Sequence, residues 1–202
     1  MRKKILVSGF DAFGGESINP SWEAVKLLPD KTDAFDIEKI LIPTVYVEAA
    51  DRLYERAVQI GADMVVSVGQ AGGRAAITPE VIGINLREAS IADNAGVVHS
   101  GEPIRDGAPA AYFSTVAVRD MVSALREQGI PAALSYSAGA FVCNDVLYTL
   151  LDRFDKSGVK IGFIHVPYIP EQTKDKADKP SMPLEKIADA LLIAITAAAE
   201  KL

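Results

Sequence analysis

The single cysteine of the chain, Cys143, lies where a nucleophile could be activated. It belongs to Ser135-Tyr-Ser-Ala-Gly-Ala-Phe-Val-Cys-Asn144, which predicts a strand, a glycine turn and the start of a helix. A helix N-terminus stabilises a thiolate and lowers the pKa of the thiol. Its free backbone N–H groups can also bind the oxyanion that forms when a thiolate attacks a carbonyl. The position indicates acyl transfer, although a lone cysteine is more often a small buried apolar residue.

His165 is the residue that could act as a base for this thiol. It follows an apolar run at residues 161–164 and precedes Pro167, so we expect it at the carboxyl end of a buried strand. A cysteine nucleophile works best beside an imidazole. Taken alone, a histidine in this position is more often a packed core residue. The other histidine, His99, lies in a loop rich in Gly, Glu and Pro and is expected in solvent.

A third group has to orient the imidazole, and the sequence leaves three candidates for it. Glu80 in Thr78-Pro-Glu-Val81 is a carboxylate at the start of an apolar run, just after a glycine-rich loop. By position alone it would be an exposed charge at the end of a loop. Asp93 and Asp145 are its rivals, and spacing does not choose among the three.

Two glycine-rich loops follow predicted strands, and neither has the spacing of a nucleotide-binding motif. Gly69-Gln-Ala-Gly-Gly-Arg74 is neither GxGxxG nor a Walker loop, and Gly9-Phe-Asp-Ala-Phe-Gly-Gly15 lacks that spacing as well. The glycines instead allow the backbone to approach a small ligand. Phe10 and Phe13 in the earlier loop serve either as walls for that ligand or as core anchors for the loop.

Strands and helices are predicted to alternate along the chain of 202 residues. Strands are expected at residues 4–8, 37–42, 63–69, 81–86, 132–137 and 160–166, and helices at residues 21–28, 46–60, 115–128, 141–154 and 184–201. Ser114 is expected to cap the third helix, and residues 92–111 are expected to be irregular. This order indicates βαβ units and a mainly parallel sheet. Ligands of such sheets bind at the carboxyl ends of the strands, where Cys143 and His165 are expected.

Residues 167–183 are polar, contain four prolines and show no helix or strand pattern. Long segments of this kind inside a compact domain often form lids. Because the segment begins two residues after His165, it is either a mobile lid over the site or a solvated connection.

The composition indicates one domain over residues 1–202 and excludes several function classes. Hydrophobic residues make up 49% and charged residues 24%, which is typical of a folded protein. With 21 basic and 27 acidic residues the net charge is −6, which disfavours nucleic-acid and anionic-membrane partners. One cysteine and two histidines exclude an intrachain disulfide, a thiolate zinc cluster and a histidine-rich metal site. No apolar stretch reaches the ~20 residues that span a bilayer, so a cytoplasmic location is expected.

Three segments together resemble the pyroglutamyl peptidase I (pyrrolidone carboxyl peptidase) family. They are Gly9-Phe-Asp-Ala-Phe-Gly-Gly-Glu16 with Asn19-Pro-Ser-Trp-Glu23, Gly69-Gln-Ala-Gly-Gly-Arg74 through Pro79-Glu80, and Ser137-Ala-Gly-Ala-Phe-Val-Cys-Asn144 with His165-Val-Pro-Tyr168. They occur in the family's order, and the resemblance covers essentially the whole chain. The sequence departs from the family at Ala12, where proline is expected, at Ser90, where arginine is common, and at Ala140, where threonine is common.

The resemblance implies a cytosolic cysteine peptidase that removes an N-terminal pyroglutamyl residue from peptides and needs no metal or organic cofactor. It implies a catalytic triad of Glu80, Cys143 and His165. The positions that it implies for binding the lactam ring are Phe10, Phe13, Asn19, Thr44, Gln70, Ile91, Phe141 and Val142. The implied fold is a three-layer α/β/α sandwich with a twisted, mainly parallel central sheet, assembled as a homotetramer.

The chemistry of the ring agrees with this interpretation. A pyrrolidone ring has one N–H donor, one carbonyl acceptor and apolar methylenes, so aromatic walls with a few placed amides suit it. A charged amino terminus would lose its water in such a pocket at a high cost in free energy. Two other functions stay open, a catalytically silent binder of pyroglutamyl groups and a hydrolase that uses the triad on another small amide.

Overall fold

The computed structural model describes residues 2–176 and 178–202. Its central sheet has, within these residues, five strands in the spatial order β2-β1-β3-β9-β4. They are β1 (Lys3–Phe10), β2 (Phe35–Ile42), β3 (Met64–Gln70), β4 (Thr78–Pro79) and β9 (Lys160–Val166). The first four in the spatial order run parallel, and the edge strand β4 is antiparallel to β9. The predicted mainly parallel sheet is confirmed.

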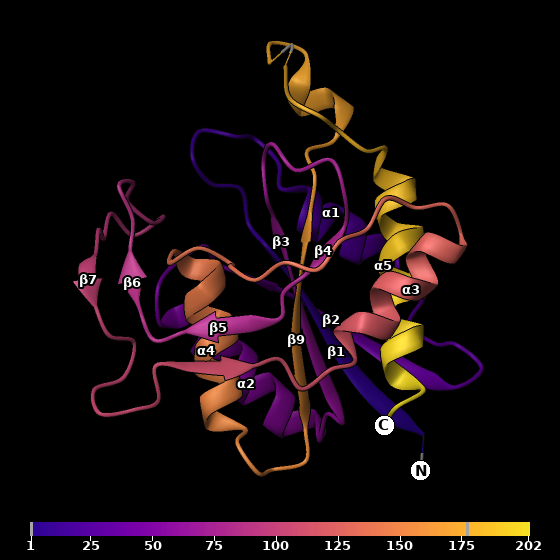
Figure 1. Ribbon diagram of the computed structural model, residues 1–202, viewed down its shortest axis with the longest axis horizontal. Coiled ribbons are helices and arrows are strands. Elements are labelled where there is room, and N and C mark those ends of the chain that lie inside the picture. Colours follow the sequence, from indigo (N-terminus) through magenta and orange to yellow (C-terminus); the bar gives the residue numbers. More distant parts are fainter. Residues whose placement is uncertain (1, 177) are drawn as a thin grey trace.

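Helices cover both faces of this sheet (Figure 1). In the described part of the chain they are α1 (Pro20–Leu27), α2 (Glu48–Ile60), α3 (Val118–Glu127), α4 (Val142–Arg153) and α5 (Leu184–Ala199). α1, α3 and α5 pack on the face that presents Val7 and Val66, while α2 and α4 pack on the face that presents Leu6 and Val65. Strands buried on both faces feed two cores, as a covered parallel sheet requires. The predicted α/β/α sandwich is confirmed.

Two short antiparallel ribbons and a 3-10 helix complete the described elements. β5 (Ile82–Ile84) pairs with β8 (Ala111–Phe113), and β6 (Arg87–Glu88) pairs with β7 (Ser100–Glu102). The 3-10 helix η1 spans Pro170–Thr173. The expected strand at residues 81–86 is therefore shorter and lies outside the main sheet, and residues 92–111 are not wholly irregular. Strands of two or three residues are too short to show the alternation by which a sequence predicts them. None of the described helices is long and apolar enough to cross a membrane.

Residues 132–137, predicted as a strand, are not one. Two isolated parallel bridges, Ile77↔Ala132 and Glu80↔Ser135, connect them to the region of β4. Ile77 donates its N–H to the carbonyl oxygen of Pro131, just before this segment, at 2.9 Å, and Val81 donates its N–H to the carbonyl oxygen of Ser135 at 2.7 Å. Pro79 lies between them and has no N–H to donate, so the ladder is interrupted there. The segment runs beside β4 as an incomplete extra edge.

The predicted helix at residues 115–128 begins later, at Val118, and Ser114 does not cap it. The Ser114 hydroxyl instead donates to the carbonyl oxygen of Glu80 at 2.6 Å. The Ser114 N–H donates to the carbonyl oxygen of Val81 at 2.9 Å. Long-range pairing thus replaces the first helical turn that local propensity favours. It also fixes the backbone that carries Glu80.

The loop after β1 is anchored at both ends. A β-carbon at Gly9 would lie 2.5 Å from the Cα atom of Trp22 in α1. This is a backbone atom that cannot rotate away, so glycine is required for β1 and α1 to approach so closely. At the other end of the loop, Asn19 caps α1 by accepting the N–H of Ser21 at 3.1 Å. Phe13 lies between these anchors.

Candidate active site

Cys143 and His165 lie on the same face of the sheet, near the carboxyl ends of its strands. Cys143 is in the first turn of α4, and His165 is near the end of β9. A β-carbon at Gly69 would lie 3.0 Å from the sulfur of Cys143. Gly69 is paired in register with His165 on the neighbouring strand, and residues paired in this way present their side chains to one face. The thiol and the imidazole are therefore on the same face of the sheet, over the neighbouring strands β3 and β9.

Glu80 is the carboxylate that is hydrogen bonded to this imidazole. Its Oε1 atom lies 2.7 Å from His165 Nδ1, and both side chains are buried. Since an ionised carboxylate only accepts, Nδ1 carries the proton and Nε2 is free to accept another. The two rivals bind elsewhere: Asp93 accepts N–H groups of its own loop, and Asp145 accepts from an arginine.

Arg74 is a further charged residue at this site, and it was not predicted as a site residue. Its Nη1 atom donates to Glu80 Oε1 at 2.8 Å and to the Thr78 hydroxyl at 2.6 Å. Its Nη2 atom donates to the carbonyl oxygen of Ser137 at 3.1 Å. The guanidinium thus joins a glycine-rich loop, the Glu80 carboxylate and the loop that leads to Cys143. In the sequence it looks like any loop arginine, because nothing there shows that it bonds to residues four, six and 63 positions away.

Burial determines the protonation states of these groups. It raises the pKa of the Cys143 thiol to about 12, and the Glu80 charge acts in the same direction. Burial also lowers the pKa of His165, which the hydrogen bond to Glu80 offsets only in part. Burial would raise the pKa of Glu80, but the hydrogen bond and charge of His165, together with hydrogen bonds from Ser135 and Arg74, outweigh it, so this pKa is lowered. At neutral pH the pair is a neutral thiol and a neutral imidazole, not the ready thiolate that a helix N-terminus alone would favour.

Two buried polar side chains hold the first turn of α4 in place. Asn144 accepts the Ile84 N–H and donates to the Ile84 carbonyl oxygen, both at 2.9 Å. Asp145 accepts from Arg87 Nε at 2.6 Å. Breaking such bonds would leave buried polar groups unpaired, which costs about 1–3 kcal/mol each. They fix the rotation of α4 and with it the direction of Cys143.

Aromatic rings gather beside the start of α4. The centroids of Phe13 and Phe141 are 6.1 Å apart, and Tyr46 meets Phe141 edge-on at 5.4 Å. Tyr46 was not predicted as a site residue, because it stands in an apolar pattern typical of a helix. Phe10 and Val142, predicted as pocket residues, are buried in the core, where Phe10 packs on a phenylalanine of β9 at 6.2 Å.

The predicted polar pocket residues are bonded to the surrounding loops. Asn19 Nδ2 donates to a carbonyl oxygen of the loop after β1 at 2.8 Å, and the Thr44 N–H donates to a carboxylate of that loop at 2.7 Å. Gln70 Oε1 accepts from Gln172 Nε2 at 2.8 Å. Ile91 is half exposed in the loop after β6. Of the predicted ring-binding residues, Phe13 and Phe141 thus lie together, and Asn19, Thr44 and Gln70 support the loops around them.

The segment of residues 167–183 packs back toward the carboxyl ends of the strands. Ala177 lies outside the described residues. Gln172 reaches Gln70, and Lys176 forms an ion pair with Glu16. The Lys176 ammonium also lies 4.6 Å from the centre of the Tyr168 ring. The segment contains η1, which the sequence did not predict. Its function as a lid or as a plain connection stays a prediction.

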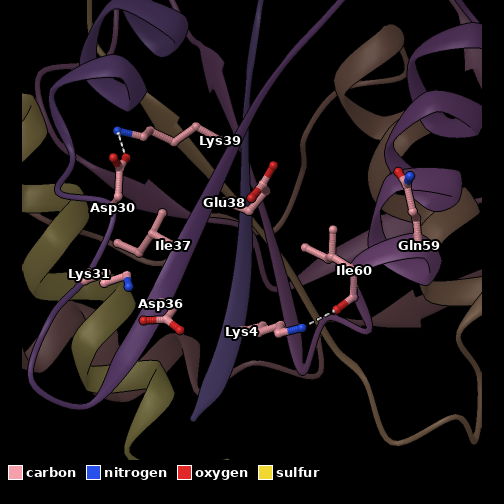
Figure 2. A pocket seen from close by; sticks show the side chains of 9 residues that line it. All are labelled: Lys4, Asp30, Lys31, Asp36, Ile37, Glu38, Lys39, Gln59 and Ile60. Carbon is pink, nitrogen blue, oxygen red and sulfur yellow. Dashed lines mark hydrogen bonds and ion pairs between the residues drawn. The ribbon is translucent and has the colours of Figure 1, made fainter.

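A cavity of about 640 Å³ lies at the opposite end of the strands, near the amino ends of β1 and β2 (Figure 2). Its charged side chains are mostly engaged nearby: Lys39 pairs with Asp30 at 2.6 Å, and Lys4 donates to the Ile60 carbonyl oxygen at 3.0 Å. In the described chain, no group of His, Cys, Asp or Glu side chains could hold a metal ion. The residues able to do acyl chemistry therefore lie near the carboxyl ends of the strands.

An α/β sandwich that brings a cysteine at a helix start to one face with an imidazole and a buried carboxylate defines a cysteine hydrolase. A family model described as pyroglutamyl peptidase matches residues 3–201. The chain belongs to this family of cysteine peptidases.

Individual relatives agree with the family match. A pyrrolidone-carboxylate peptidase of Staphylococcus saprophyticus is 48% identical over 98% of this chain and 93% of its own. The crystal structure of pyroglutamyl peptidase I from Bacillus amyloliquefaciens superposes with a TM-score of 0.95 at 46% identity, covering 98% of this chain and 96% of that one. A mutant pyrrolidone carboxyl peptidase from Pyrococcus furiosus gives a TM-score of 0.93 at 41% identity, covering 98% and 99%.

Proposed function

We propose that this protein hydrolyses the amide bond after an N-terminal pyroglutamyl residue of peptides, with Cys143 as nucleophile, His165 as base and Glu80 as the group that orients it. The observation that carries the proposal is the hydrogen bond of 2.7 Å between Glu80 and His165, on the face of the sheet that Cys143 also borders. The names of the relatives, pyrrolidone-carboxylate peptidase and pyroglutamyl peptidase I, support the substrate.

The reaction begins with proton transfer from the thiol. His165 Nε2 accepts the proton of Cys143 as the sulfur attacks the pyroglutamyl carbonyl carbon. Backbone N–H groups at the start of α4 stabilise the oxyanion. The imidazolium then protonates the leaving amine, and the C–N bond breaks. A thioester of Cys143 remains, and water activated by His165 hydrolyses it to pyroglutamate and free thiol.

Glu80 and Arg74 support the charge that moves through His165. The imidazolium forms beside the ionised carboxylate, which compensates for its burial. Arg74 holds that carboxylate at 2.8 Å and so limits its freedom to turn away. Phe13 and Phe141 hold the apolar face of the ring, and a charged amino terminus would enter such a site only by losing its water.

The reaction is tested with pyroglutamyl and prolyl amides of the same fluorescent amine. The two rings have the same size, but the prolyl ring carries a cationic amine in place of the lactam. We expect release of the amine from the pyroglutamyl compound and at least about 100-fold slower release from the prolyl compound, since desolvating an unpaired charge costs several kcal/mol. Equal rates would point to a general small-amide hydrolase. Binding of pyroglutamate without any release, by folded and reduced protein, would point to a silent binder.

The acid limb of activity is expected below pH 6.5, the ordinary pKa of histidine. His165 must be neutral to accept the thiol proton, and burial lowers its pKa, so activity is lost only when the pH falls through this lowered value. Measuring kcat/KM against pH gives the limb of the free enzyme. Removing the Arg74 charge in Arg74→Gln should move the limb to higher pH, because this cation lowers the pKa of His165.

Thiolate absorbance gives an independent check, since Cys143 is the one cysteine in the sequence. The difference between wild type and Cys143→Ala should show no thiolate at neutral pH. An acid limb above pH 6.5, or a thiolate band at pH 7, would contradict the neutral pair. The homotetramer, the cytoplasmic location and the single domain of residues 1–202 stay predictions.

A further inference from the structure

The two oxygens of the Glu80 carboxylate are held unequally. Oε1 accepts two hydrogen bonds, from His165 Nδ1 at 2.7 Å and from Arg74 Nη1 at 2.8 Å. Oε2 is also buried, and none of the described residues gives it a hydrogen bond of good geometry. An unpaired buried acceptor costs free energy, and the terminal torsion of a glutamate has only a weak preference of its own. A donor to Oε2 would therefore both satisfy this oxygen and fix the plane of the carboxylate.

Ser135 is the residue that lies directly opposite Glu80. Its N–H donates to the Pro79 carbonyl oxygen at 3.0 Å, and its carbonyl oxygen accepts the Val81 N–H at 2.7 Å. These two bonds form the parallel bridge between Glu80 and Ser135 and fix Ser135 from both sides of the glutamate. Neighbouring strands lie about 4.8 Å apart, and paired residues present their side chains to the same face. The Ser135 hydroxyl and the Glu80 carboxylate therefore lie side by side.

This face of the sheet is the one that carries the imidazole. Thr78 of β4 is paired with His165 of β9, and Glu80 follows Thr78 by two residues, which returns its side chain to the same face. Ser135 shares this face through its pairing with Glu80, whereas the neighbouring Leu134 packs on the core of the other face. The order of the chain segments across the sheet thus places Glu80 between His165 and Ser135.

The Ser135 hydroxyl is available for a bond to Oε2. It donates to the Ser137 carbonyl oxygen at 3.3 Å and accepts the Ser137 N–H at 3.5 Å, which are both long for hydrogen bonds. The Ser137 carbonyl oxygen does not depend on it, because Arg74 Nη2 also donates there, at 3.1 Å. Burial raises the pKa of Glu80, and His165, Ser135 and Arg74 lower it, which agrees with a serine dipole close to the carboxylate.

We propose that Ser135 is a positioning residue, whose hydroxyl donates to Glu80 Oε2 and fixes the plane of the carboxylate against the imidazole. The proposal rests on the proposed function, in which Glu80 orients His165. With donors on both oxygens the carboxylate cannot turn about its terminal bond, so Oε1 keeps facing Nδ1 while the imidazolium forms and is consumed. Without Ser135, His165 and Arg74 hold one oxygen only, and the plane is free to turn.

The first test measures kcat and KM for a fluorescent pyroglutamyl amide in Ser135→Ala and Ser135→Thr. The alanine variant should lose about tenfold in kcat with little change in KM, as expected for one hydrogen bond to a charged group. Threonine keeps the hydroxyl, and Ser135 lines an open groove of about 440 Å³ that can take the added methyl group, so Ser135→Thr should keep most of the activity. Ser157→Ala is the matched control and should keep wild-type kcat, because the Ser157 hydroxyl bonds the Phe154 carbonyl oxygen at the far end of α4.

A double-mutant cycle separates positioning of Glu80 from a general effect on structure. In a Glu80→Ala background there is no carboxylate to hold, so Ser135→Ala should have no further effect on kcat, whereas independent effects would multiply. The proton on His165 Nδ1 gives a second readout by NMR at low field. Its signal should be sharp in wild type and Ser135→Thr and broadened by exchange in Ser135→Ala. His99→Gln assigns it, because the sequence has two histidines.

The outcomes distinguish this proposal from the proposed function. Wild-type kcat in Ser135→Ala, or an equal loss on adding Ser135→Ala to Glu80→Ala, would overturn the positioning of Glu80 by Ser135 alone. If Glu80→Ala does not fold, a sharp low-field proton in Ser135→Ala would overturn it in the same way. Failure of wild type to cleave the pyroglutamyl amide would overturn the proposed function, and the positioning proposal with it.

Discussion

Replacing Cys143 by alanine is expected to abolish hydrolysis of pyroglutamyl amides while leaving the protein folded. Without the sulfur no thioester can form, and only the oxyanion site and the ring pocket would remain to promote direct attack of water on the amide. Loss of the nucleophile in a catalytic triad costs about 10⁶-fold in kcat, and we expect at least about 10⁴-fold here. The fold should persist because Asn144 and Asp145, not the thiol, anchor the start of α4.

The measurement is kcat/KM for a fluorescent pyroglutamyl amide, with thermal unfolding as the control for folding. Cys143→Ser is the matched variant, because it keeps the shape of the side chain but has a hydroxyl that is far harder to deprotonate. Both variants should be inactive and should unfold within a few degrees of wild type. Turnover within about tenfold of wild type in either variant would exclude Cys143 as the nucleophile.

Replacing Glu80 by glutamine is expected to lower kcat by about 10³- to 10⁴-fold with little change in KM. The corresponding change in a serine protease costs about 10⁴-fold, because the histidine then adopts the wrong tautomer. Glutamine keeps the size of the side chain, so the loss reports charge and not volume. The lost charge also leaves the buried imidazolium of the reaction without compensation and Arg74 without its carboxylate.

Glu102→Gln provides the matched control for this change. Glu102 also faces a histidine, with 3.3 Å between Glu102 Oε2 and His99 Nδ1, but its side chain is largely exposed. Exposed ion pairs contribute little, so Glu102→Gln should retain activity within about twofold. A Glu80→Gln enzyme with wild-type kcat would remove Glu80 from the mechanism, and a loss confined to KM would make it a binding residue.

The sequence predicted those parts of the fold in which a local pattern decides the structure. Residues 160–166 form β9 with the bounds that were expected, because a continuous apolar run is buried on both faces. The prediction of a strand at residues 132–137 was wrong because strand formation there depends on a distant partner, and Pro79 interrupts the ladder. The prediction that Ser114 caps a helix was wrong for the same reason, since the hydrogen bonds of Ser114 to Val81 and Glu80 outweigh helix capping.

The candidate site shows the same division. Residue types and spacing were enough to select Cys143 and His165, since each stands at the predicted end of an element. They were not enough to choose Glu80 over Asp93 and Asp145, because that choice depends on which carboxylate crosses 85 residues of sequence to reach His165. The direction of a side chain was also inaccessible from the sequence: Phe10 and Val142 are buried, and their role in binding the ring stays a prediction.

The central claim, that Cys143 carries the acyl group, is tested most directly by trapping the intermediate. The enzyme is mixed with a pyroglutamyl ester of a good leaving group, quenched in acid within milliseconds and analysed by mass spectrometry of the intact chain and its peptides. We predict an added mass of one pyroglutamyl group on the peptide that contains Cys143, removed by neutral hydroxylamine as a thioester is, and absent from Cys143→Ala. Turnover without any adduct under conditions where deacylation limits the rate, or an adduct on another residue, would show that Cys143 does not carry the acyl group.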